Sequence, residues 1–126
     1  MPFTLQQDPT YSWTVPLVIP TDDGQAKDSF VAEFRRLSQT RINEIVRIYK
    51  ESERSRSYDE GDEFVDQDLA RELLAGWRDV INVVDGKKEQ IPFSDAALTK
   101  LLELPTVAAQ IIRAWFESID ISKKKR

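Results

Sequence analysis

The last third of the chain reads FSDAALTKLLELPTVAAQIIRAWFESI over residues 93–119, and its apolar residues recur every three or four positions. This spacing predicts two amphipathic helices, because side chains three or four residues apart share one helix face. Ser94 predicts the start of the first helix, since a serine before a helix accepts a hydrogen bond from a free backbone amide. Pro105 ends that helix, because proline disfavours helical geometry in the residue before it, and Thr106 opens the second.

The second of these helices has an unusually wide apolar face. A helix needs an apolar sector of only about 100° to face a core. Two interpretations therefore stay open: it is the central core helix, or part of its face contacts another subunit or partner. The apolar residues concerned are Val107, Ala108, Ile111, Ile112, Trp115, Phe116 and Ile119.

The N-terminal part of the chain predicts a β-hairpin. Residues 13–20 (WTVPLVIP) are β-branched and bounded by prolines, which restrict a strand to the edge of a sheet. Residues 21–24 (TDDG) favour a reversal of the chain. Residues 30–37 alternate as a returning strand would, although their apolar positions also fit a helix. We expect strand 30–37 to pair with an edge strand at Val15–Ile19, preceded by a flexible arm at residues 1–12.

The middle of the chain predicts two more helices. One starts after Ser38 and carries an apolar stripe through Tyr49, and it is followed by a charged, flexible loop at Glu51–Glu63. The other is capped by Asp66 and has Trp77 at the end of its buried face. A small hairpin follows near residues 80–91. The predicted fold is mainly α (α+β), with an N-terminal β-hairpin followed by a small bundle of about four helices, in one domain at residues 13–119 with a basic tail at residues 120–126.

Composition argues against an enzyme. The chain has no histidine and no cysteine, which are the commonest general base and the usual thiolate nucleophile and metal ligand. Its four glycines are scattered, so no glycine-rich phosphate loop is present. The acidic residues between Asp59 and Asp68 do not fit the spacing of a calcium-binding loop and read as a solvated surface. We therefore expect no catalytic residues, no metal and no cofactor.

Charge and hydropathy bear on the partners. The net charge is −4 even though the last four residues are basic, so the body of the chain is acidic and unsuited to nucleic acid. No apolar run approaches the roughly 20 residues needed to span a membrane. One alternative stays open, a helix-turn-helix DNA-binding regulator formed by residues 94–118. Only Lys100 and Arg113 are basic there, and the second helix is apolar rather than rich in base-reading side chains.

Six segments together resemble the tail assembly chaperones of long-tailed bacteriophages. The resemblance covers roughly residues 13–119, and its most specific parts are the Gly76-Trp77 pair, the Phe93-Ser94 helix start and the Leu-Pro-x-Val link before an aromatic-rich final helix. The segments are residues 13–20 (WTVPLVIP), 30–37 (FVAEFRRL), 73–80 (LLAGWRDV), 91–94 (IPFS), 101–107 (LLELPTV) and 114–118 (AWFES).

This resemblance implies a late, non-structural protein of viral morphogenesis that acts in the host cell cytoplasm and is absent from the mature virion. Such a chaperone binds the tape measure protein, helps to recruit tail tube protein subunits and forms homo-oligomers, with neither a nucleic-acid nor a membrane partner. Some members also have a frameshifted longer form, which adenine-rich codons for Lys123–Lys125 would permit. The surfaces expected to mediate partner binding or self-association are the edge strand and the last helix, at Val15, Leu17, Ile19, Val107, Ile111, Ile112, Trp115 and Phe116.

Overall fold

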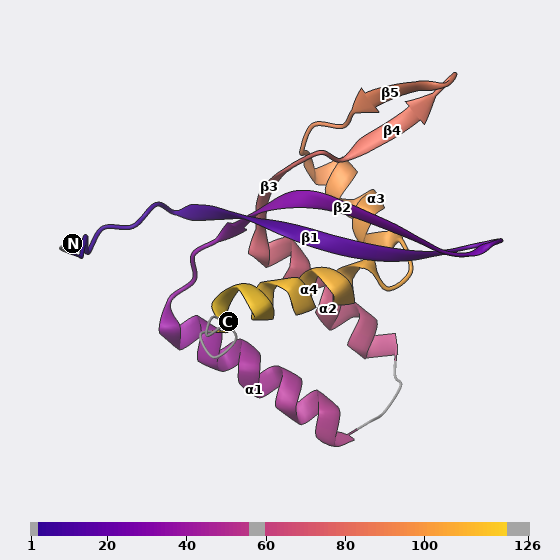
Figure 1. The fold of residues 1–126 in the computed structure, drawn as a ribbon. Coiled ribbons are helices and arrows are strands. Elements are labelled where there is room, and N and C mark those ends of the chain that lie inside the picture. The colour runs from indigo at the N-terminus through magenta and orange to yellow at the C-terminus, as the bar shows by residue number, and fades with distance from the viewer. Residues whose placement is uncertain (1–2, 56–59, 121–126) are drawn as a thin grey trace.

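The computed structural model describes residues 3–55 and 60–120 of the 126-residue chain, which form five strands and four helices (Figure 1). In chain order these are β1 (Thr10–Thr21), β2 (Gly24–Arg35), α1 (Gln39–Ser55), α2 (Glu60–Leu73), β3 (Leu74–Arg78), β4 (Ile81–Val84), β5 (Lys87–Gln90), α3 (Asp95–Glu103) and α4 (Val107–Ile119).

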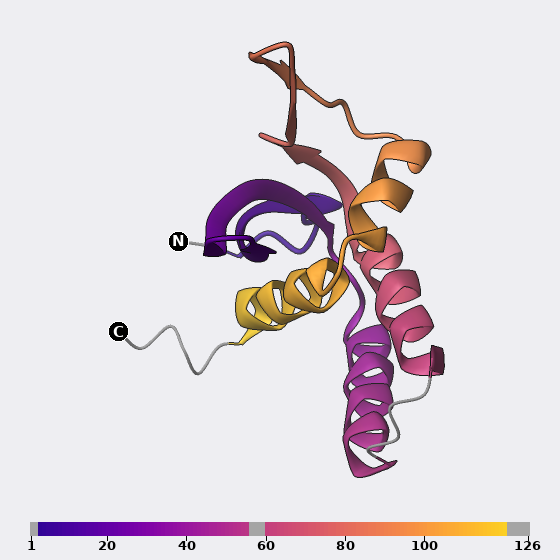
Figure 2. The ribbon, with the colours of Figure 1, turned by 90° about the vertical axis from the view of Figure 1, so that its right-hand side faces the viewer.

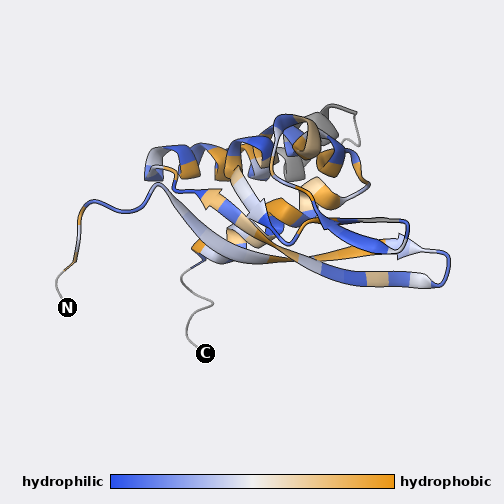
Figure 3. Cartoon of the chain, turned by 90° about the horizontal axis from the view of Figure 1, so that it is seen from above, coloured by the Kyte–Doolittle hydropathy of each residue, from blue (hydrophilic) through white to orange (hydrophobic). Residues whose placement is uncertain are grey.

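The main sheet is antiparallel, with the strand order β1-β2-β3. β1 and β2 pair in one unbroken register that places Val15 opposite Phe30, which confirms the predicted hairpin and the edge position of β1. β3 pairs only with the C-terminal part of β2, from Val31 onward. The turn end of the hairpin therefore projects as a two-stranded ribbon, mostly hydrophilic toward its tip (Figure 3).

The core lies between one face of this sheet and α4, with α2 and α3 alongside (Figure 2). Alternate residues of β1 and β2 point inward, as expected for an antiparallel sheet with one solvated face. Phe34 and Trp115 are the largest side chains that are almost completely buried there. α4 is thus the central core helix, and that interpretation of its wide apolar face is confirmed for most of its residues.

The predicted helix starts are confirmed in α1, α3 and α4. The Ser38 hydroxyl accepts a hydrogen bond from the Arg41 amide at 3.1 Å, and the Ser94 hydroxyl accepts one from the Ala97 amide at 3.1 Å. Thr106 precedes α4 in a left-handed conformation with φ 65° and makes no side-chain cap. The small predicted hairpin is also present, as β4 and β5.

The prediction of a mainly α fold is wrong, because two antiparallel sheets account for a large share of the chain and the helices pack around a sheet rather than as a bundle. Trp77 lies on β3, not at the end of a helix. Residues 73–77 satisfy both helical and strand spacing, and pairing with β2 decides between them. Gly76 leaves room for the Glu33 side chain on the paired strand, since a Cβ at position 76 would lie 2.9 Å from a carboxylate oxygen of Glu33.

Other boundaries also differ from the prediction. β1 begins at Thr10, so the last three residues assigned to the arm belong to the sheet. The loop predicted at Glu51–Glu63 is helical at both ends, because α1 continues to Ser55 and α2 starts at Glu60; residues 56–59 lie outside the described residues. Glu and Arg support a helix without apolar neighbours, which explains the longer α1. Asp66 lies inside α2 rather than capping it. Of the predicted basic tail, residues 121–126 also lie outside the described residues.

Candidate protein-binding surfaces

Most of the side chains expected to contact a partner are used in the core of the chain itself. Six of them are buried: Val15, Leu17, Val107, Ile111, Ile112 and Trp115. The other two, Ile19 and Phe116, are half-buried. These six side chains are therefore not accessible to a partner, and only the margins of this face beside α4 are.

The C-terminal half of edge strand β1 is closed to a further strand. The Val18 N–H donates to Gln110 Oε1 at 2.7 Å, and Gln110 Nε2 donates to the Val18 carbonyl at 2.9 Å. The side-chain amide of Gln110 on α4 thus occupies both outward-facing backbone groups of Val18. Pro16 and Pro20, two residues to either side, have no N–H to offer. The predicted edge at Val15–Ile19 is present but blocked.

The half-buried Phe116 belongs to a groove of about 480 Å³ between α1 and α4. Its walls are apolar side chains, and two cationic residues stand among them. The groove is lined by Val46, Tyr49 and Lys50 of α1 and by Ala109, Ile112, Arg113 and Phe116 of α4. It brings together two of the predicted contact residues, Ile112 and Phe116.

The wall formed by α1 is held in place by aromatic and polar contacts. The Tyr49 and Phe116 rings meet edge to face, with centroids 5.7 Å apart. The Tyr49 hydroxyl donates to the Asp66 carboxylate on α2, and burial together with this hydrogen bond raises the pKa of Tyr49, so its hydroxyl stays protonated. One turn before Tyr49 on α1, Ile45 is completely buried. These contacts join α1 to α2 and α4 beside the groove.

The start of α1 is tied to the end of α2 by a two-point ion pair. Arg41 Nε and Nη2 donate to the two Glu72 carboxylate oxygens at 2.7 and 2.6 Å. The hydrogen bonds from Arg41 lower the pKa of Glu72, and the pKa of Arg41 is raised in turn. A forked pair of this kind fixes orientation as well as distance. It is one of the contacts that join α1 to α2.

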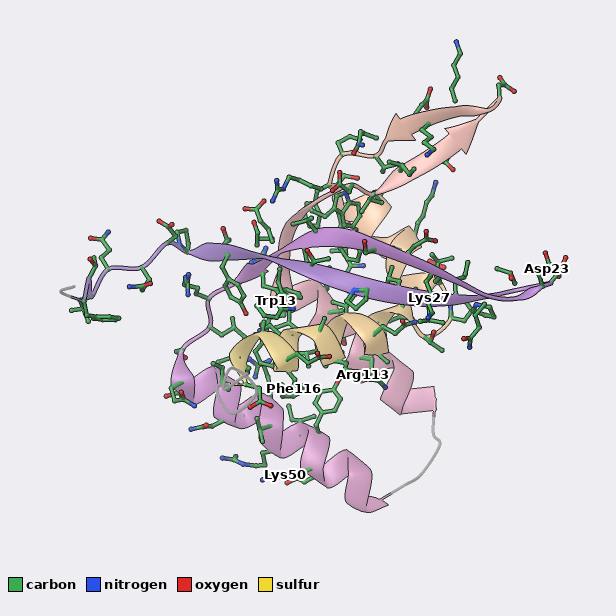
Figure 4. All side chains as sticks on the ribbon, in the orientation of Figure 1. Trp13, Asp23, Lys27, Lys50, Arg113 and Phe116 are labelled. Carbon is green, nitrogen blue, oxygen red and sulfur yellow. The ribbon has the colours of Figure 1, made fainter. Side chains whose placement is uncertain are left out.

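The two cations of the groove are available to a partner. Lys50 and Arg113 are both exposed, and neither has an ion pair in the part of the chain that the structure describes. Figure 4 shows Phe116 pointing from α4 toward α1, with Arg113 farther along α4 and Lys50 on α1. An apolar groove with positive charge beside it suits an apolar side chain flanked by acidic residues.

The contribution of α1 to this surface was not predicted from the sequence. Val46 and Tyr49 were assigned to an ordinary apolar stripe, and Lys50 was given no role. The available signal was the number of apolar residues on α1, since Ile42, Ile45, Val46, Ile48 and Tyr49 exceed what one buried face needs, and Ile48 is indeed 41% exposed.

Within residues 3–55 and 60–120, no group of acidic side chains is arranged to hold a metal ion, and no helix is long and apolar enough to cross a membrane. Comparisons with protein-family models, with curated proteins and with solved structures return no match.

Proposed function

We propose that the chain is a phage tail assembly chaperone that binds a helical segment of the tape measure protein in the groove between α1 and α4. The observation that carries the proposal is that groove, in which α1 and α4 present apolar side chains beside Lys50 and Arg113. The resemblance described above supplies the identity of the partner. In this role the protein acts in the host cytoplasm, helps to recruit tail tube protein subunits and leaves before the virion is mature.

The chemistry of the groove favours an amphipathic helix as its occupant. Two neighbouring helices form a trough in which a third helix can insert apolar residues spaced three or four positions apart. Val46, Ala109 and Phe116 supply the accessible apolar contact, and the two cations select a segment with acidic residues beside its apolar stripe. Covering the apolar stripes of a long helical protein in this way would keep that protein from aggregating before assembly.

The alternative of a DNA-binding regulator requires α4 to present polar side chains to a DNA groove. α4 instead uses most of its surface in the core, and its exposed residues are Ala109, Arg113 and Glu117. One cation beside one carboxylate gives little attraction for phosphate. We therefore do not adopt this alternative, and a duplex-binding assay serves as its test below.

The proposal is tested by reversing the two charges of the groove. The double variant Lys50→Glu/Arg113→Glu changes exposed side chains and should leave the fold intact. We expect it to bind the tape measure protein at least about tenfold more weakly than the unchanged chain, because two attractions become repulsions at the same contact. Affinity is measured by titration calorimetry with the tape measure protein encoded in the same genome.

A matched control removes the effect of overall charge. Lys27→Glu/Lys88→Glu makes the same change in net charge at exposed positions on β2 and β5 that do not line the groove. Figure 4 shows Lys27 on the hairpin rather than on α1 or α4. This control should bind as the unchanged chain does. Equal affinity for all three proteins would reject the groove, whereas salt-dependent binding to duplex DNA without any binding to the tape measure protein would favour the regulator.

A further inference from the structure

The backbone of β1 alternates between groups that face β2 and groups that face outward. Arg36 N–H donates to the Pro9 carbonyl at 2.9 Å, so residue 9 faces β2, and Val18 faces the other way, toward Gln110. The register between β1 and β2 has no irregularity from Thr10 to Thr21. The backbone groups of every even-numbered residue in β1 therefore point to the outer edge.

These outward positions divide into a closed and an open set. Residues 16 and 20 are prolines and Val18 is occupied by Gln110, so the edge is closed from residue 16 onward. Thr10, Ser12 and Thr14 face outward as well, and no described residue hydrogen bonds to their backbone N–H or C=O groups. A row of unpaired groups on an edge strand is a template for another strand. The open template is short and ends where the prolines begin.

There is room for a strand beside this open edge. A hollow of about 610 Å³ lies along it, lined by residues 12–14 and 16 of β1 and by Ala114 and Glu117 of α4. α4 thus approaches the edge closely at Gln110 and leaves space at Ser12–Thr14. Only the N-terminal half of β1 is accessible at this edge, so a pairing strand can contact residues 10–14 and cannot extend past residue 16.

We infer that the open edge at Thr10–Thr14 pairs antiparallel with the same segment of a second copy of this chain, about a two-fold axis at Ser12. In that register Thr10 lies opposite the second copy's Thr14, and Ser12 lies opposite its own equivalent. All three open positions of each copy are then paired, and residue 16 of one copy lies opposite residue 8 of the other, just before β1 begins. The inference rests on the sheet edge alone and does not depend on the proposed function.

The sequence of the segment supports pairing with itself. Thr10-Tyr11-Ser12-Trp13-Thr14 reads the same chemically in both directions, hydroxyl, aromatic, hydroxyl, aromatic, hydroxyl, as a two-fold contact requires. Threonine pairs across neighbouring strands are favourable, as are aromatic pairs. The part of β2 near the turn has a second open edge, because β3 pairs with β2 only from Val31 onward. That edge is less suitable for a two-fold contact. Its middle residue is Lys27, so the contact would place the lysines of the two copies opposite each other.

The pairing is tested by cysteine cross-linking, for which the chain is well suited because it contains no cysteine. Opposed residues in a hydrogen-bonded antiparallel pair have Cα atoms about 5.5 Å apart, within reach of a disulfide. Ser12→Cys should form a covalent dimer on mild oxidation. Thr10→Cys and Thr14→Cys should cross-link to each other when mixed, faster than either does alone. Ser29→Cys, an exposed serine on β2, is the matched control and should remain monomeric.

A second variant tests the backbone contact directly. Thr14→Pro removes an outward N–H that makes no hydrogen bond within the described chain, so the fold should survive, and Thr14→Val keeps that N–H. In sedimentation velocity we expect a concentration-dependent dimer for the unchanged chain and for Thr14→Val, and its loss for Thr14→Pro. A chain that stays monomeric throughout, or a Ser29→Cys dimer that forms as readily as the Ser12→Cys dimer, would overturn the inference.

Discussion

Replacing Gln110 by methionine tests whether its side-chain amide holds the edge of the sheet. Methionine keeps the length of the side chain and a high helix propensity but removes the hydrogen bonds to Val18, at 2.7 and 2.9 Å. Each is worth about 0.5–1.5 kcal/mol net, so the pair contributes about 2 kcal/mol. The third bond, to the Thr106 hydroxyl at 3.0 Å, is exposed and adds little. For a chain of this size that loss lowers Tm by roughly 5–10 °C.

Urea unfolding followed by circular dichroism measures the loss as a change in the free energy of unfolding. Gln110→Glu is the matched variant, because a carboxylate still accepts from the Val18 N–H but has no donor for the Val18 carbonyl. Its stability should lie near or below that of Gln110→Met, since its negative charge faces a carbonyl oxygen. If Gln110→Met unfolds with the same free energy as the unchanged chain, the two bonds do not stabilise the edge and the reasoning is refuted.

Two further substitutions test the ends of the helices. Ser94→Ala should lower the free energy of unfolding by about 1 kcal/mol, because the Ala97 amide loses its acceptor. Urea unfolding measures this change, and an unchanged free energy of unfolding would mean that the cap is not formed. Glu72→Gln should cost up to about 1 kcal/mol at neutral pH, since the pair with Arg41 is partly exposed. The lowered pKa of Glu72 contributes stability above its unfolded pKa and loses it as the pH falls through the folded pKa, so the two proteins should converge in acid. A constant difference across pH would contradict that assignment.

The β-branched run and the turn residues were sufficient to predict the hairpin, and the serine caps predicted the helix starts at Ser38 and Ser94. The core role of α4 was one of two interpretations that the sequence left open, and it is the one confirmed for most of the residues on its apolar face.

Hydrophobic spacing failed at residues 73–77, where the same apolar positions fit a helix and a strand. These residues form a strand because they pair with the free edge of β2. The pairing joins residues far apart in the chain, so the spacing of nearby residues does not reveal it. Hydrophobic spacing failed again after Tyr49, where an absence of apolar residues was interpreted as a loop although α1 continues.

The candidate surfaces were less predictable than the fold. Apolar character marks buried and exposed contact residues alike, so Val107 and Trp115 could not be separated from Phe116 by sequence. The groove needs two helices that are distant in the chain, and its position follows from their packing. The closure of β1 by Gln110 joins residues 92 positions apart. Pro16 and Pro20 can be read from the sequence, but the sequence does not show that both lie at outward-facing backbone positions of β1.

The proposed function is tested most directly by photo-crosslinking from the groove to the tape measure protein. A photoreactive phenylalanine derivative replaces Ala109, which is exposed and lines the groove, and in a parallel protein it replaces Lys27 on the projecting ribbon. When each protein is co-expressed with the tape measure protein, we expect the probe at position 109 to cross-link to amphipathic helical segments with acidic flanks, and the probe at position 27 to give no such product. Equal labelling from both positions, or none from position 109, would contradict binding in the groove between α1 and α4.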